Sequence, residues 1–160
     1  MIPADAPKVV RMNDRAYLLA GTIHLADQRD RAYPGLIEAG KIKQAIAVEK
    51  LELSRCMVAQ WRWACDPAEP FEPPYGNVGP FGAPYYRLAE EMTAAAETAR
   101  RRADRVPEDT RAAMLADLYE ALAWWQQPYV ESGTARIVFW VEIERRARAR
   151  QRAADMREAA

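Results

Sequence analysis

The chain has only one histidine and two cysteines among its 160 residues, which excludes several classes of site. A single histidine rules out His-rich zinc sites and helices that bind a metal through paired histidines. A Ser-His-Asp triad would have to use His24. The sequence also has no Gly-rich phosphate loop and no Gly-x-Ser-x-Gly motif. We therefore expect no enzyme, no catalytic residue, no metal and no cofactor.

Long apolar runs and a net charge are missing as well. The longest apolar runs, such as residues 17–23, are far too short to span a bilayer, and the first eight residues lack the apolar region of a signal peptide. Cys56 and Cys65 leave a disulfide open, but a buried, reduced thiol is favoured. We expect a cytoplasmic protein with no membrane partner. Because 23 basic residues balance 23 acidic ones, any DNA binding would depend on a local patch.

Half of the residues are hydrophobic and 29% are charged, which is ordinary for a globular protein. The pattern predicts a mainly α (α+β) fold with three regions: a head over 1–65, a connector over 66–84 and a helical region for oligomerisation or partner binding over 85–160. The head would begin with a short β-hairpin. Its strands are expected at Lys8–Met12 and Arg15–His24, because Asn13-Asp14 between two apolar runs is a hairpin signal. A polar connector, Asp27–Pro34, would follow.

The connector over 66–84 is rich in proline and glycine, so neither a helix nor a strand ladder can continue through it. Aromatic residues are nevertheless interleaved there and just beyond it: Phe71, Tyr75, Phe81, Tyr85 and Tyr86. The segment either packs over the core as an ordered loop or offers its rings to a partner. We favour packing, because exposed aromatic loops are the exception.

The region after the connector predicts two helices and a third, longer one. The first runs from Tyr85 toward Arg105, and Pro107 with two acidic residues marks the start of the second, which ends before Pro128. The short loop between them predicts an antiparallel hairpin. The second helix would bury Met114, Leu115, Leu118, Leu122 and Trp125. The run Ile137–Ile143 fits either a third strand or, as we favour, one long helix with the Arg-Ala-rich segment that follows.

The segment Gln44–Trp61 carries the most specific spacing in the chain. Its apolar residues predict two helices, Leu36–Glu52 and Arg55–Ala64, with a break near Leu53-Ser54 and Ser54 as the N-cap of the second helix. This order resembles the helix-turn-helix of phage-repressor and Cro-like DNA-binding domains. Val48 stands where that family prefers Ala, and Glu52 stands where it usually has Gly.

The resemblance implies a set of DNA contacts. The second helix would present Arg55, Gln60 and Arg62 to base edges in the major groove, while Lys41, Lys43 and Lys50 would contact phosphates. The alternative is a pair of amphipathic core helices that share the spacing. A further basic stretch comprises Arg145, Arg146, Arg148, Arg150 and Arg152. It suits either phosphate recognition or, as nearby acidic residues favour, a solvated helix end.

Three functions follow from these features. The first is a small DNA-binding regulator or phage packaging accessory. The alternative is a protein–protein interaction module of a phage or mobile element that binds no nucleic acid. The third is a hydrolase, because Gly21-Thr22-Ile23-His24 resembles the opening motif of the TraB/GumN family of proposed metal-dependent peptidases; without that family's second such motif, we interpret His24 as structural. We also expect a homo-oligomer through residues 107–145, with an interface of Trp124, Trp125, Phe139 and Trp140.

Overall fold

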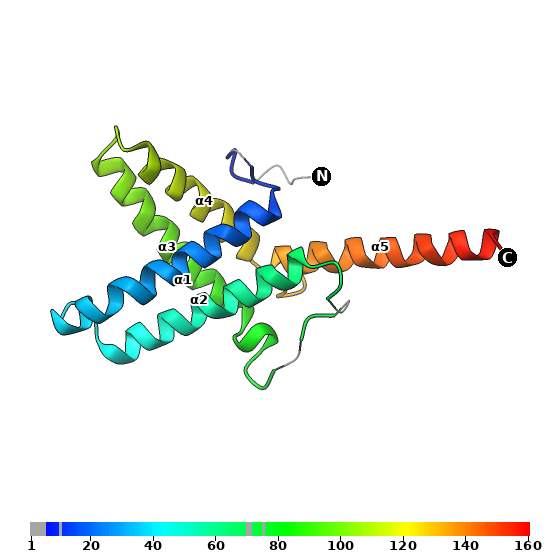
Figure 1. The fold of residues 1–160 in the computed structure, drawn as a ribbon, viewed down its shortest axis with the longest axis horizontal. Helices are drawn as coiled ribbons and strands as arrows, with labels where there is room; N and C mark the ends of the chain where they lie inside the picture. Colours follow the sequence, from blue (N-terminus) through cyan, green and yellow to red (C-terminus); the bar gives the residue numbers. More distant parts are fainter. Residues whose placement is uncertain (1–5, 10, 70–71, 75) are drawn as a thin grey trace.

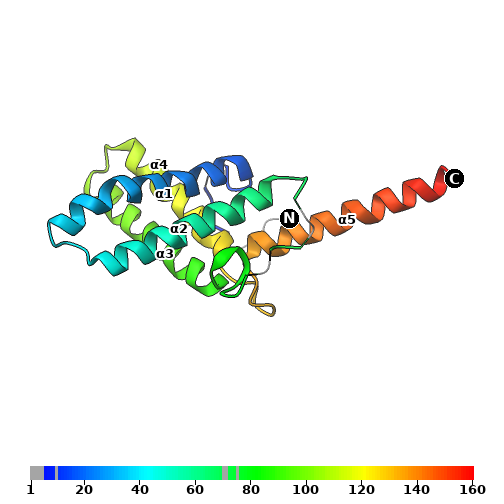
Figure 2. The same ribbon diagram turned by 60° about the horizontal axis from the view of Figure 1, so that its bottom comes forward.

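The computed structural model describes residues 6–9, 11–69, 72–74 and 76–160, and these residues form helices and no β-strand. The α-helices are α1 (Arg15–Glu38), α2 (Gln44–Cys65), α3 (Tyr85–Arg105), α4 (Thr110–Gln126) and α5 (Arg136–Glu158), with a 3-10 turn at Pro80–Gly82. Helices α1 and α2 form one hairpin, α3 and α4 form a second, and the two hairpins pack across each other (Figure 1). Helix α5 leaves this body and extends away from it in both views (Figures 1 and 2).

The mainly α part of the predicted fold is confirmed, and the N-terminal β-hairpin is wrong. Residues 15–24, expected as a strand, are the first turns of α1. The Asp14 carboxylate caps this helix by accepting a hydrogen bond from the Tyr17 backbone N–H at 3.0 Å. That bond and the Arg11 guanidinium hold the pKa of Asp14 below its usual value. An Asx residue before an apolar run is a signal for a helix start as well as for a turn, and here it is a helix start.

The predicted break in the second helical segment is also wrong, because α2 is continuous through Leu53 and Ser54. Ser54 does not cap a helix: its hydroxyl donates to the Lys50 carbonyl at 2.8 Å, one turn back. No Gly or Pro lies between Gln44 and Cys65, so nothing interrupts the backbone ladder. The chain turns instead at residues 39–43, where Gly40 has a φ of 65°, and the predicted connector at 27–34 lies inside α1.

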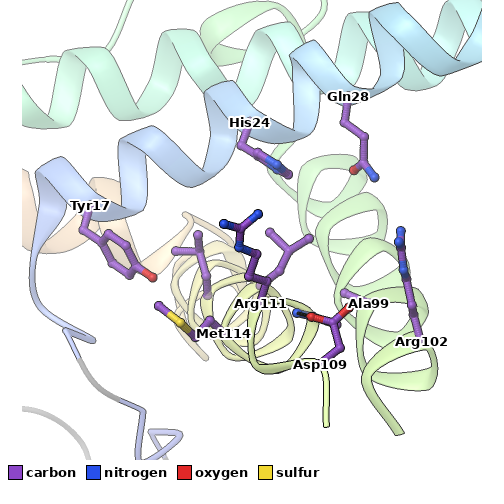
Figure 3. A pocket seen from close by; sticks show the side chains of 11 residues that line it. Tyr17, His24, Gln28, Ala99, Arg102, Asp109, Arg111 and Met114 are labelled. Atoms are coloured by element: carbon purple, nitrogen blue, oxygen red, sulfur yellow. Dashed lines mark hydrogen bonds between the residues drawn. The ribbon is translucent and has the colours of Figure 1, made fainter. Parts of the chain in front are cut away.

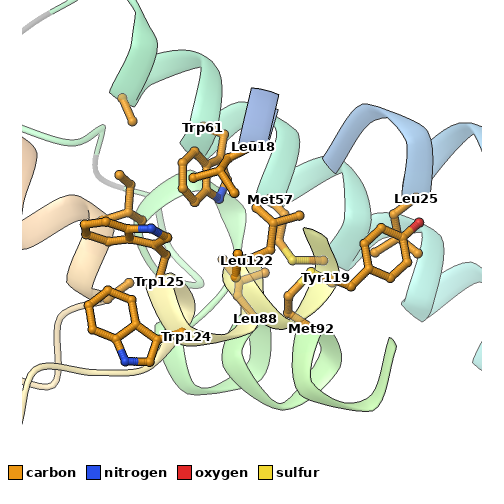
Figure 4. Close-up of a cluster of buried hydrophobic side chains, with 14 of the residues drawn as sticks. Leu18, Leu25, Met57, Trp61, Leu88, Met92, Tyr119, Leu122, Trp124 and Trp125 are labelled. Carbon is orange, nitrogen blue, oxygen red and sulfur yellow. The ribbon is translucent and has the colours of Figure 1, made fainter. Parts of the chain in front are cut away.

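One apolar core joins the two hairpins. Its centre is fully buried and draws on four helices: Leu18 from α1, Met57 and Trp61 from α2, Leu88 and Met92 from α3, and Leu122 from α4 (Figure 4). A glycine brings α1 close to α4, since a Cβ on Gly21 would lie 2.9 Å from Leu118 Cγ. The predicted head and the predicted C-terminal region therefore contribute to the same core.

A buried ion pair crosses this body from one hairpin to the other. The Arg29 guanidinium on α1 donates to the Glu91 carboxylate on α3 and to the Ser54 hydroxyl on α2, the latter at 2.8 Å. The Lys50 ammonium joins the same carboxylate at 3.1 Å. Arg29 and Glu91 are each 8% exposed, and burying such charges is tolerated only when they are paired and hydrogen-bonded.

The connector packs on the body where the structure describes it. The Phe81 ring lies 5.5 Å from the Trp63 ring, and Tyr85 also packs against the core, which confirms the packing alternative for these two rings. Tyr86 is exposed, and Phe71 and Tyr75 lie outside the described residues.

Cys56 and Cys65 are free thiols, and partial burial raises the pKa of both.

The C-terminal helices follow the sequence closely. The predicted helical hairpin is present, and residues 137–143 belong to the long helix rather than to a strand. Helix α4 begins at Thr110, with the Asp109 carboxylate accepting from the Ala112 N–H at 3.0 Å. Met114 was expected in the core but is 61% exposed. In the part of the chain that the structure describes, no helix carries an apolar stretch long enough to cross a bilayer.

Replacing Glu52 with Gly tests the continuity of α2. In a helix-turn-helix this position is at the turn, where Gly is favoured, whereas in a continuous helix Gly costs about 1 kcal/mol relative to Ala. We expect Glu52→Gly to lower the free energy of unfolding by about that amount relative to Glu52→Ala, as measured by urea denaturation. A Gly variant at least as stable as the Ala variant would contradict a continuous α2.

Removing the Glu91 carboxylate tests the buried ion pair. Glu91→Leu leaves the Arg29 charge buried without its partner, so we expect a loss of about 3–5 kcal/mol in the free energy of unfolding. The double variant Arg29→Met/Glu91→Leu removes both charges and should recover part of that loss. Glu90→Gln is the matched control, because Glu90 is an exposed neighbour whose ion-pair partner among the described residues is Arg87. If the double variant is no more stable than Glu91→Leu, the unpaired charge of Arg29 does not cause the loss of stability in the single variant.

Candidate nucleic-acid interface

The structure does not bring the predicted DNA-contacting residues together on a recognition helix. Gln60 is 0% exposed, inside the core, and cannot reach a base edge. Lys50 is engaged with Glu91. Arg55 is exposed and pairs with Glu52 at 2.8 Å. Arg62 is also exposed, while Lys41 and Lys43 lie at the opposite end of α2, about 28 Å away along its axis.

The aromatic residues predicted as an interface are used largely within the chain. Trp124 and Trp125 are buried, and the Trp125 indole N–H donates to the Met12 carbonyl at 2.9 Å. The Arg136 guanidinium lies 4.3 Å above the Trp124 ring. Phe139 stacks on Tyr129 at 4.5 Å, and Trp140 is half-buried against the core. The homo-oligomer stays a prediction. The argument for it is weaker, because these rings are packed within the chain and leave less apolar surface for an interface.

Helix α5 contacts the described part of the body through its first three turns. Ile137, Val138 and Val141 are buried against the core. Further along, the Arg145 guanidinium stacks 4.3 Å above the Trp63 ring and donates to the Trp63 carbonyl at 2.6 Å. Glu144 accepts a hydrogen bond from Arg15 at 2.7 Å. These contacts fix the direction in which the rest of the helix leaves the body.

Beyond Arg145 every residue of α5 is exposed, and we call residues 146–158 the arm (Figures 1 and 2). An isolated helix of this length is marginal in water, because its first turn is costly to form. Here the buried turns at the start of α5 nucleate the helix, so the arm only extends it. Ala and Arg, the commonest residues of the arm, are strong helix formers, and Gln151 donates to Asp155 at 2.7 Å one turn on. The sequence therefore supports a helix whose side chains stay exposed beside the described part of the chain.

The arginines of the arm fall into two rows. At about 100° per residue, Arg146, Arg150 and Arg157 share one side, while Arg148 and Arg152 share another. A strip of small and apolar side chains separates the rows: Ala149, Ala153 and Met156. By the same geometry, Glu158 lies on the side away from this strip, and Asp155 lies on the side of Arg148, two turns earlier. Arg148, Arg150 and Arg152 form no ion pair with any described residue, so their charges face solvent.

The basic stretch was visible in the sequence, and its interpretation as a solvated helix end agrees with the structure, in which every residue of α5 after Arg145 is exposed. The available signal was the absence of any acidic residue from Arg145 to Ala154, together with the absence of large apolar residues between Ile143 and Met156. A helix with no apolar face has no core to join.

His24 does not end a strand: it is exposed on α1, with its Nδ1 3.0 Å from the Tyr119 hydroxyl. Burial raises the pKa of Tyr119. Among the described residues no three His, Cys, Asp or Glu side chains converge as ligands for a metal ion.

Comparison with known proteins adds no assignment, since no family model, no curated protein and no solved structure matches the chain.

Proposed function

We propose that this protein is a small, non-enzymatic DNA-binding protein that binds duplex DNA through the arm of α5 rather than through α2. The observation that carries the proposal is a fully exposed helix with arginine rows on two sides and no acidic residue on the strip between them. Arginine is the residue best suited to phosphate, because its planar guanidinium makes paired hydrogen bonds and stays charged at all relevant pH values.

The dimensions of the arm fit the major groove. A helix with its side chains is about 10–12 Å across, and the B-DNA major groove is about 12 Å wide. With the Ala149–Ala153 strip facing the floor of the groove, the two arginine rows face its opposite walls, which carry the phosphates of the two strands. The arm is about 20 Å long, or about six base pairs. The small side chains of the strip permit close approach.

The contacts available to the arm favour affinity over sequence specificity. Phosphate contacts position a protein without reading sequence, whereas base-edge hydrogen bonds specify it. The strip offers only methyl and thioether groups, which suit contact with thymine methyl groups and no other base-edge feature. The neutral net charge of the whole chain restricts nonspecific attraction to the arm. We therefore expect strong salt dependence and weak sequence preference.

The charge pattern disfavours self-association of the arm. If two arms packed strip to strip, the arginine rows of both copies would line the same seam, where like charges repel. An anionic partner with charge on both flanks avoids this repulsion, and a duplex has that shape. The arm is therefore better suited to DNA than to a second copy.

Replacing three of the arm arginines that form no ion pair with a described residue tests the proposal. Arg148→Gln/Arg150→Gln/Arg152→Gln removes three phosphate contacts, so we expect at least about tenfold weaker binding to a short fluorescent duplex in an anisotropy titration at low salt. The slope of log affinity against log salt should fall by about 3, because each lost phosphate contact removes about 0.9.

The matched control removes the same charge from the helix first predicted to bind DNA. Lys43→Gln/Arg55→Gln/Arg62→Gln changes three exposed cations on or beside α2 and should leave both the affinity and the salt slope unchanged. Loss of binding in this control with retention in the arm variant would assign the contact to α2. Absence of duplex binding by the unmodified protein at low salt would reject DNA binding altogether.

A further inference from the structure

A groove opens between the two hairpins on the side where their tips diverge. It has a volume of about 370 Å³ and adjoins a second hollow of about 440 Å³, with which it shares the lining residues Gln28, Ala99, Arg102 and Leu115. In the second hollow His24 and Gln28 extend from α1 toward the α3–α4 hairpin, and Arg102 rises from α3 (Figure 3). We call the first space the hairpin groove. Its size is in the range of pockets that hold small organic molecules.

The floor and walls of the hairpin groove are apolar. Leu25 and Ala95 are buried at its floor, and Leu36, Ile42 and Leu115 line its walls half-buried. These side chains come from both hairpins. An elongated apolar group lying along the groove would remove them from water, and burial of apolar surface is the main favourable term in ligand binding.

The charged residues that line this groove are all cations. Arg29, Lys50 and Arg102 border it, and no carboxylate of the described residues does. Behind this lining, Arg29 and Lys50 share the single carboxylate of Glu91, so the buried cluster carries one excess positive charge. The Lys50 side chain is 33% exposed and therefore accessible from the groove. Arg102, on α3, forms no ion pair with any described residue.

We infer that the hairpin groove binds an amphipathic carboxylate, with its apolar chain along Leu25, Leu36 and Leu115 and its carboxylate on Lys50. The carboxylate would be the second anion of the cluster and would balance the charge that Glu91 leaves over. The Arg102 cation raises the potential of the groove and attracts the same ligand. This inference is independent of the arm, because it involves no residue of α5.

Decanoate is the probe for this site, and isothermal titration below its micelle concentration is the measurement. We expect one decanoate to bind each chain, and decan-1-ol, which has the same chain without the charge, to bind at least about tenfold more weakly. Equal binding of the alcohol would overturn the assigned role of the cations. Absence of decanoate binding would overturn the site itself.

Two variants locate the ligand. Lys50→Met should weaken decanoate binding at least about tenfold, while Lys41→Met, an exposed lysine outside the groove, should leave it unchanged. Because Lys50 also contacts Glu91, a second variant avoids the ion cluster: Ala94→Trp, at an exposed position on the wall of the groove, fills the space and should abolish binding. Circular dichroism verifies that each variant is folded. Undiminished binding to Ala94→Trp or to Lys50→Met would overturn the inference.

Discussion

The apolar layer in which Leu18, Trp61 and Leu122 meet is the contact on which the rest of the structure depends. It takes side chains from α1, α2 and α4, with α3 packed beneath, and it fixes how the two hairpins cross. The layer ends at Val141, the last buried residue of the chain. Since no apolar face follows, α5 has nothing further to pack on and must leave the body. The exposed arm is therefore a consequence of where the core stops.

The ion pair of Arg29 with Glu91 adds orientation to this core. A buried pair of this kind contributes little net stability compared with an apolar replacement, but its geometry is demanding, because both charges need partners. Here the partners come from three helices: α1, α2 and α3. These contacts link the two hairpins beside the apolar layer, and the hairpin groove lies between the same hairpins. The same residues thus support the fold and leave one positive charge facing the groove.

How far the sequence predicts this structure depends on whether local signals suffice. Helices α3 and α4 follow from their apolar spacing and from the start signal after Pro107, and their predicted limits agree with the structure, whereas for 137–143 the sequence left a strand open beside the favoured long helix. The prediction of a β-hairpin at Asn13-Asp14 was wrong because an Asx residue before an apolar run is a signal for both a turn and a helix start. The predicted break at Leu53-Ser54 was wrong because a continuous amphipathic helix can have the same spacing of apolar residues. The arginines of the arm were visible in the sequence, but their exposure depends on where the core ends. The burial of Gln60 depends on how the two hairpins cross. Both properties are set by tertiary packing, which local sequence signals do not give.

The central claim is that the arm is the part of the protein that meets DNA. The most direct measurement is a titration of ¹⁵N-labelled protein with a short duplex, followed by nuclear magnetic resonance of the backbone amides and arginine side chains. The account predicts shifts confined to residues 145–158, with the Nε–H signals of Arg148, Arg150 and Arg152 among the largest. Shifts centred on Arg55 and Arg62, or no shift anywhere at saturating duplex, would contradict it.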